Sequence, residues 1–165
     1  MGRRERQGRD VTDEDHARLF AFEQDFVDTL HCVPMAVRLK LDRAGIKLTL
    51  RQWSRFAKAD RGELLARPCR SPDEIAAYRG RLQALVDSCT GEVARPLDER
   101  VVETWLSPTP PAAIQAFASA RGLPTLTETA WRALSELERF ALTKLCRENH
   151  DNVNFVPALR EFHIL

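Results

Sequence analysis

The stretch that decides the fold is TETAWRALSELERFALTKLCR, residues 127–147. On a helical wheel at 100° per residue its apolar side chains form one broad arc, and polar side chains lie opposite. The arc contains Ala130, Trp131, Leu134, Leu137, Ala141, Leu142 and Leu145. We therefore expect one long amphipathic helix from the cap Thr127 to about Arg147, packed by this arc against a hydrophobic core.

Glu138 interrupts that apolar arc, between Trp131 and Leu145. A carboxylate in such a place must be paired with a cation, be protonated, or reach the edge of the contact. We expect an ion pair with an arginine of an earlier helix, and Arg38 is the candidate. A general acid or a metal ligand is the alternative, but no second acid or histidine stands at a helpful spacing.

The rest of the chain carries further helix signals, which together predict an all-α fold of about six to seven helices. Ser71-Pro-Asp-Glu74 has the cap, the proline and the acidic first turn of a helix start. Residues 46–50 alternate apolar and polar, and without an obvious partner strand they predict an extended connector. The expected helical segments besides 127–147 are 19–30, 35–44, 49–56 with a further turn or two over 63–67, 71–90, 97–106 and 111–122.

Composition limits the function classes. The chain has 165 residues with 44% hydrophobic and 30% charged residues, as in a globular protein. Its 25 basic and 24 acidic residues leave a net charge of +1, so no bulk basic excess favours nucleic acid. No apolar run approaches the roughly 20 residues of a membrane helix. We predict a cytoplasmic protein with a flexible charged tail, residues 1–14, and one helical domain, residues 15–165.

Cysteines and histidines suggest no complete site. Cys32, Cys69, Cys89 and Cys146 are scattered and form no CxxC or zinc-finger spacing. In a reducing compartment they are expected to be free thiols, mostly buried. The sequence also lacks a Walker loop, GxGxxG, GxSxG and HExxH. We therefore predict no catalytic residue, no metal and no cofactor. The alternative is a metal- or iron–sulfur-handling protein that uses Cys32, Cys146, His31 and His150.

A polar run, Arg147 to Asn154, follows the long helix. Its asparagines suit a helix exit, where amides satisfy free carbonyls, and this structural turn is the favoured interpretation. A recognition loop is the alternative, because function often lies on polar loops held by rigid elements. His150 and Asp151 could form an acid/base pair, although adjacency on a loop says little about geometry.

Two ends of the sequence resemble a known family. The first is residues 22–27, 32–42 and 45–48; the second is residues 139–145, His150, residues 154–159 and Glu161-Phe162. Together with Trp53, Trp105 and Trp131 they are similar to the nitrate reductase-associated protein family, over roughly residues 20–163. His31, where a basic arginine is more usual, and the arginine-rich tail are departures outside these motifs.

The resemblance implies a small protein of bacterial nitrate assimilation. Family members are encoded near, or needed for, an assimilatory nitrate reductase that carries a molybdopterin cofactor and an iron–sulfur cluster. We expect a non-enzymatic accessory or maturation factor that contacts this reductase, with a homodimer left open. The expected contact residues are His150, Asn152, Asn154, Phe155, Arg38, Asp42 and Glu138. The alternatives are the metal-handling protein, a small enzyme built on Glu138 and His150, and a helical protein without a link to nitrate.

Overall fold

The computed structural model describes residues 15–24, 31–97, 103–147 and 150–165, and the predicted tail, residues 1–14, lies outside them. The described chain is helical, as predicted, with one small sheet. The α-helices are α2 (Met35–Ala44), α3 (Leu50–Arg55), α4 (Lys58–Ala66), α5 (Pro72–Thr90), α6 (Ala112–Ala120), α7 (Glu128–Ala133), α8 (Glu136–Leu145) and α9 (Phe155–Glu161). The 3-10 helices are η1 (Ala21–Glu23), η2 (Thr104–Leu106) and η3 (His150–Asn154), and the strands are β1 (Ile46–Lys47) and β2 (Arg95–Pro96).

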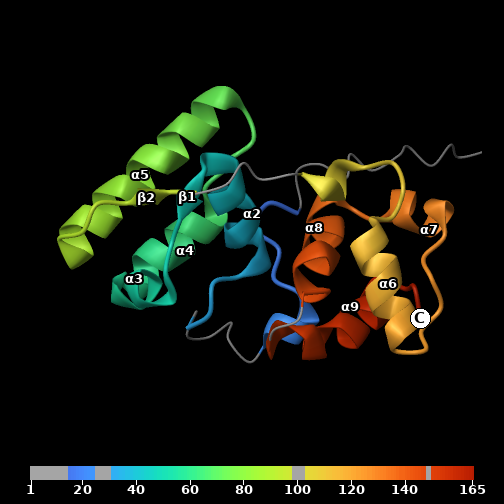
Figure 1. Cartoon of the computed structure of the whole chain (residues 1–165). Coiled ribbons are helices and arrows are strands. Elements are labelled where there is room, and N and C mark those ends of the chain that lie inside the picture. Colours follow the sequence, from blue (N-terminus) through green and yellow to red (C-terminus); the bar gives the residue numbers. More distant parts are fainter. Residues whose placement is uncertain (1–14, 25–30, 98–102, 148–149) are drawn as a thin grey trace, which may run out of the picture.

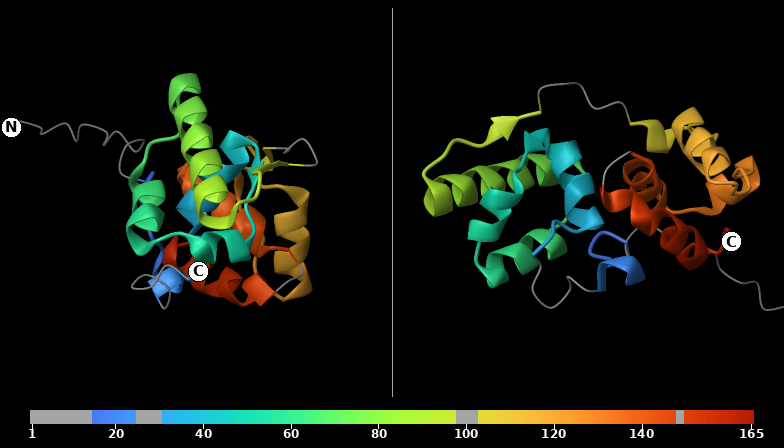
Figure 2. Two further views of the ribbon diagram at one scale, coloured as in Figure 1. Left: turned by 90° about the vertical axis from the view of Figure 1, so that its left-hand side faces the viewer. Right: turned by 60° about the horizontal axis from the view of Figure 1, so that its bottom comes forward.

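The helices form two lobes that lie side by side (Figures 1 and 2). The α2–α5 lobe contains α2 to α5 with the small sheet, and its core is built around Trp53, Tyr78 and Leu82. The α6–α9 lobe contains η1, η2 and α6 to α9, and its core is built around Trp131 and Phe140. Each lobe therefore has its own hydrophobic cluster, and one helix with apolar residues on two opposite faces connects the two clusters.

That connecting helix is α2. Its residues Met35, Ala36 and Leu39 belong to the core of the α6–α9 lobe. Its residues Val37, Leu41 and Ala44 belong to the core of the α2–α5 lobe. Because α2 packs on α8 on one side and on α5 on the other, it is buried nearly all round. The two lobes thus share one wall.

The single helix expected over residues 127–147 is wrong: the chain forms two helices, α7 and α8. Leu134 has an extended backbone, with φ −73° and ψ 146°, and Ser135 caps α8. Ser135 Oγ accepts a hydrogen bond from the Glu138 backbone N–H at 3.2 Å, and the Glu138 carboxylate accepts one from the Ser135 N–H at 2.8 Å. This reciprocal capping box ends α7 and begins α8.

Other helix ends follow the sequence signals. The helix α5 begins at Pro72 with a capping box between Ser71 and Glu74, and α3 begins with one between Thr49 and Gln52. After α2, Gly45 takes the left-handed conformation with φ 67°, which terminates the helix as expected.

Two expectations need correction. The connector at residues 46–50 has a partner: β1 pairs antiparallel with β2, with Ile46 opposite Pro96. The helix expected over 97–106 is observed as the short η2, with residues 98–102 outside the described part. Of the helix expected over 19–30, the structure describes η1 and the helical residue Gln24; residues 25–30 lie outside the described part, so the rest of this prediction is not tested. The helix α9 was not expected, and it closes the α6–α9 lobe. In the part of the chain that the structure describes, no helix has the length and apolar character needed to cross a membrane.

Candidate functional site

The carboxylate of Glu138 has two structural partners. One of its oxygens accepts the hydrogen bond from the Ser135 backbone N–H described above, and the other lies 3.1 Å from Arg18 Nη1. Both side chains are largely removed from solvent, with 32% of Arg18 and 15% of Glu138 exposed. The expectation of an ion pair is confirmed, but the arginine is Arg18, which precedes η1, and not the expected Arg38. The carboxylate is thereby engaged in capping and charge pairing.

Arg18 also joins the far end of the chain to this position. Arg18 Nη2 lies 3.8 Å from Glu161 Oε1, and Glu161 is the last residue of α9. Both carboxylate oxygens of Glu161 also accept hydrogen bonds at 2.9 Å from the Ala21 N–H of η1. The guanidinium also lies 4.7 Å from the centre of the Phe20 ring. Arg18 thus connects the first turn of α8, η1 and the last turn of α9.

Asp42 of α2 binds a cation from the other lobe. Lys144 Nζ of α8 lies 2.8 Å from Asp42 Oδ2, and only 11% and 14% of the two side chains are exposed. Burial lowers the pKa of Lys144 from its ordinary value, while the hydrogen bond to Asp42 opposes that shift. Arg38, which is half-buried one turn before Asp42, lies close enough for its positive charge to lower the pKa of Lys144 as well. Arg38 and Asp42 therefore converge on α8, as part of the contact between the lobes.

Two buried polar groups were missed by the sequence reasoning. The carboxylate of Glu23 accepts hydrogen bonds from the Phe20 N–H at 3.0 Å and the Met35 N–H at 2.7 Å, so it caps the start of α2. Burial raises the pKa of Glu23 above its usual range. Lys40 of α2 is 2% exposed and donates from Nζ to the Leu65 carbonyl at 2.6 Å. Hydrogen-bond partners 12 and 25 positions away, the Met35 N–H for Glu23 and the Leu65 carbonyl for Lys40, could not be read from the sequence.

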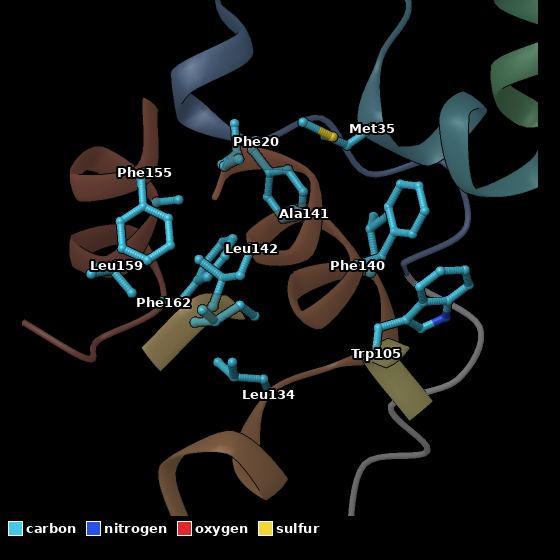
Figure 3. Close-up of a cluster of buried hydrophobic side chains, with 14 of the residues drawn as sticks. Phe20, Met35, Trp105, Leu134, Phe140, Ala141, Leu142, Phe155, Leu159 and Phe162 are labelled. Carbon is cyan, nitrogen blue, oxygen red and sulfur yellow. The ribbon is translucent and has the colours of Figure 1, made fainter. Parts of the chain in front are cut away.

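The candidate loop is the ordered 3-10 helix η3, which contacts both α8 and α9. Val153 at its surface is 71% exposed, and Asn152 and Asn154 are half-buried. Phe155 directly after it is 0% exposed, and its ring lies 4.8 Å from that of Phe117 in an edge-to-face contact. Figure 3 shows Phe155 in the buried cluster of the α6–α9 lobe. Phe155 therefore fixes the loop and is not available to a partner.

The expected contact residues do not form one site. Glu138 lies in the first turn of α8, whereas η3 follows the last turn, so about the length of a ten-residue helix, roughly 15 Å, separates them. The side chains of His150 and Asp151 lie outside the described residues. The described side chains of η3 that solvent reaches are those of Asn152, Val153 and Asn154, which we call the η3 surface.

The cysteines are free thiols in different surroundings. Cys32 is exposed, Cys69 is buried, and Cys89 and Cys146 are half-buried. Burial raises the thiol pKa values of Cys69 and Cys146, which lowers the fraction of reactive thiolate. Over the described ranges, no group of three His, Cys, Asp or Glu side chains has a geometry that could hold a metal ion.

Comparison with protein-family models gives a match. The model of a family described as conserved nitrate reductase-associated protein matches residues 19–162, which is most of the chain. Neither the curated proteins nor the solved structures provide a match. The matched range begins before η1 and runs to the end of α9, so it includes both lobes.

Proposed function

The chain belongs to the conserved nitrate reductase-associated protein family, and on that premise we propose that it is a non-enzymatic accessory protein that binds nitrate reductase through the η3 surface. The family description associates its members with the reductase. The finer statements, that binding is direct and that it assists maturation or electron delivery, are our proposal.

The observation that carries the choice of surface is the contrast between Val153 and Phe155. Val153 has 71% of its surface exposed, and burying it against a partner would be favourable. Two residues later, Phe155 is fully buried against Phe117. The exposed apolar side chain is thus presented on a fixed support, between the amides of Asn152 and Asn154. A pre-organised surface of this kind reduces the entropic cost of association.

The contacts of two carboxylates of the α6–α9 lobe, Glu138 and Glu161, support a non-enzymatic role. A general acid or base needs a carboxylate that can reach a substrate and change its proton occupancy. Glu138 is instead occupied by Ser135 and Arg18, and Glu161 is occupied by the Ala21 N–H and Arg18. These contacts cap helices and pair distant segments of the chain, so they have a structural role and involve no substrate.

The test measures binding of the full chain to purified nitrate reductase immobilised on a biosensor. The Asn152→Ala/Asn154→Ala double variant and the Val153→Asp variant are expected to bind at least about ten times more weakly, because an interface residue of this kind contributes roughly 1.4 kcal/mol or more. Far-ultraviolet circular dichroism should show unchanged helicity, since these side chains do not support the core.

A matched control is available in the other lobe. Val93, between α5 and β2, is 85% exposed, so Val93→Asp introduces the same charge at a valine that is at least as exposed as Val153. This control should bind the reductase as tightly as the wild-type chain. If Val153→Asp keeps full affinity and helicity, the η3 surface is not the contact; if the wild-type chain itself shows no binding, direct association is wrong.

A further inference from the structure

A pocket of about 330 Å³ lies at the junction of the two lobes. Its lining includes Leu39 of α2, together with Leu134 and Leu137 at the junction of α7 and α8. Arg70, from the loop between α4 and α5, and Arg132 of α7 also line it. The pocket therefore combines an apolar wall with cations contributed by both lobes. Ligand pockets commonly lie between such units and have volumes of roughly 300–1,000 Å³.

The acidic residues of the pocket, Glu136 and Asp15, each have a cationic partner. Glu136 Oε1 lies 2.7 Å from Arg43 Nη2 and accepts a hydrogen bond from Trp105 Nε1 at 3.3 Å. Asp15 Oδ1 lies 3.4 Å from Arg18, which Asp15 shares with Glu138 and Glu161, and the buried Oδ2 of Asp15 has no hydrogen-bond partner among the described residues. Glu136 therefore does not need the two remaining arginines of the lining for charge compensation.

The two remaining arginines keep free donor capacity. Arg70 is 52% exposed and reaches Glu136 only at 3.9 Å, beyond hydrogen-bonding distance. Arg132 is 61% exposed and donates to the Pro108 carbonyl at 3.3 Å and to Glu128 at 3.4 Å. Since a guanidinium carries five N–H donors in a planar fork, both can still bind an oxyanion. His16, whose Nε2 lies 3.1 Å from the Ala66 carbonyl, completes this polar side.

We propose that this pocket binds a small organic anion, with its apolar body against Leu39, Leu134 and Leu137 and its carboxylate or phosphate at Arg70 and Arg132. The volume, at the lower end of the usual range, fits a ligand about the size of one substituted ring. This inference does not depend on the proposed contact with nitrate reductase, because the pocket uses none of the residues of the η3 surface.

Binding would connect the lobes. Arg70 belongs to the α2–α5 lobe and Arg132 to the α6–α9 lobe, so one oxyanion held by both would close the junction from both sides. A ligand that binds the folded chain and not the unfolded chain raises the melting temperature as its concentration rises. Stabilisation is therefore a second readout, independent of any activity.

The experiment is isothermal titration calorimetry of the full chain with four probes: phenyl phosphate, benzoate, inorganic phosphate and benzyl alcohol. At least one of the two aromatic anions should bind with a Kd about ten times lower than inorganic phosphate and benzyl alcohol, which each carry only half of the required chemistry. The phenyl phosphate and benzoate arms distinguish a phosphate from a carboxylate as the preferred head group. The bound anion should also raise the Tm.

Variants then assign the binding to the pocket. Arg70→Ala and Arg132→Ala should each raise the Kd of the preferred aromatic anion by about ten-fold, since each removes charge-assisted hydrogen bonds. Arg55→Ala, which removes an exposed arginine of α3 outside the pocket, should leave the Kd unchanged. The proposal is overturned if the aromatic anions bind no better than inorganic phosphate and benzyl alcohol, or if Arg70→Ala and Arg132→Ala bind them as the wild-type chain does.

Discussion

Arg18 and Glu138 are 120 positions apart in the sequence, yet Arg18 Nη1 lies 3.1 Å from Glu138 Oε1. The same carboxylate caps Ser135, and the same guanidinium approaches Glu161 at the end of α9. One ion pair therefore connects the residues before η1 to the start of α8 and the end of the chain. Its role in the structure is to hold three segments of the α6–α9 lobe together.

The first prediction concerns the stability of Glu138 variants. Glu138→Ala removes both the cap and the ion pair, and we expect it to lower the free energy of unfolding by about 1–2 kcal/mol. Glu138→Gln keeps an oxygen that can cap the Ser135 N–H but loses the charge, so about half that loss is expected. Urea unfolding followed by circular dichroism measures both values.

A double-mutant cycle with Arg18→Ala provides the control. The losses from Glu138→Gln and Arg18→Ala should be less than additive, because each change breaks the same contact. The enzyme alternative makes the opposite prediction: Glu138→Gln would abolish nitrate-dependent function in cells and leave the free energy of unfolding unchanged. Full additivity together with that phenotype would refute the structural assignment of Glu138.

The sequence predicted the helical class and several helix ends, because those features depend on local spacing. The capping boxes at Ser71 and Thr49 and the left-handed Gly45 need only neighbours within a few residues. The break between α7 and α8 was local too. Ser135 and Glu138 have the same capping-box spacing, but the continuous apolar arc around them favoured a single helix.

The contacts of the candidate site were not predictable in the same way. The partner of Glu138 is Arg18, and that of Asp42 is Lys144, each brought in by tertiary packing from a distant segment. Charge pairing can be expected wherever a carboxylate lies in an apolar face, but its partner depends on how helices pack. The burial of Phe155 was not predictable either, because nothing local shows that a residue directly after a polar run belongs to the core.

The second prediction concerns the pH dependence contributed by Lys40. Burial lowers the pKa of Lys40 from 10.5 to about 8, so the folded chain releases this proton before the unfolded chain does. Below pH 8 the cost of burying the charge is fully present. Between about pH 8 and 10.5 the unfolded chain binds more protons, and the contribution of Lys40 to stability rises with pH.

Lys40→Met, which keeps the length of the side chain without its charge, is the comparison. The free energy of unfolding of the wild-type chain minus that of the variant should increase by about 2 kcal/mol between pH 7 and 10. Taking this difference cancels the groups that do not interact with Lys40; Cys69 does interact with Lys40 and keeps a residual contribution. Chemical denaturation at a series of pH values measures it; a difference that stays flat or falls with pH would contradict the depressed pKa.

The third prediction concerns metal content. The four cysteines lie in different surroundings, and the described residues contain no three-ligand group suited to a metal. The protein purified under anaerobic conditions is therefore expected to be colourless and to contain far less than one metal atom per chain by elemental analysis. A stoichiometric metal that is lost in a Cys32→Ser/Cys146→Ser variant would favour the metal-handling alternative instead.

The fourth prediction separates support from recognition at η3. Phe155→Ala removes a fully buried ring that packs on Phe117, and changes of this kind typically cost about 3–5 kcal/mol of folding free energy. Asn152→Ala/Asn154→Ala should cost less than about 1 kcal/mol, because both side chains are half-buried and outside the core. Thermal unfolding should therefore place the melting temperature of the first variant far below that of the wild type and that of the second close to it.

Phe155→Leu, which keeps an apolar side chain, should recover part of the stability and with it the binding of nitrate reductase, since Phe155 acts through the position of η3. If Phe155→Leu were as stable as the wild type but unable to bind, Phe155 would contact the partner directly, and η3 would have to open when the complex forms.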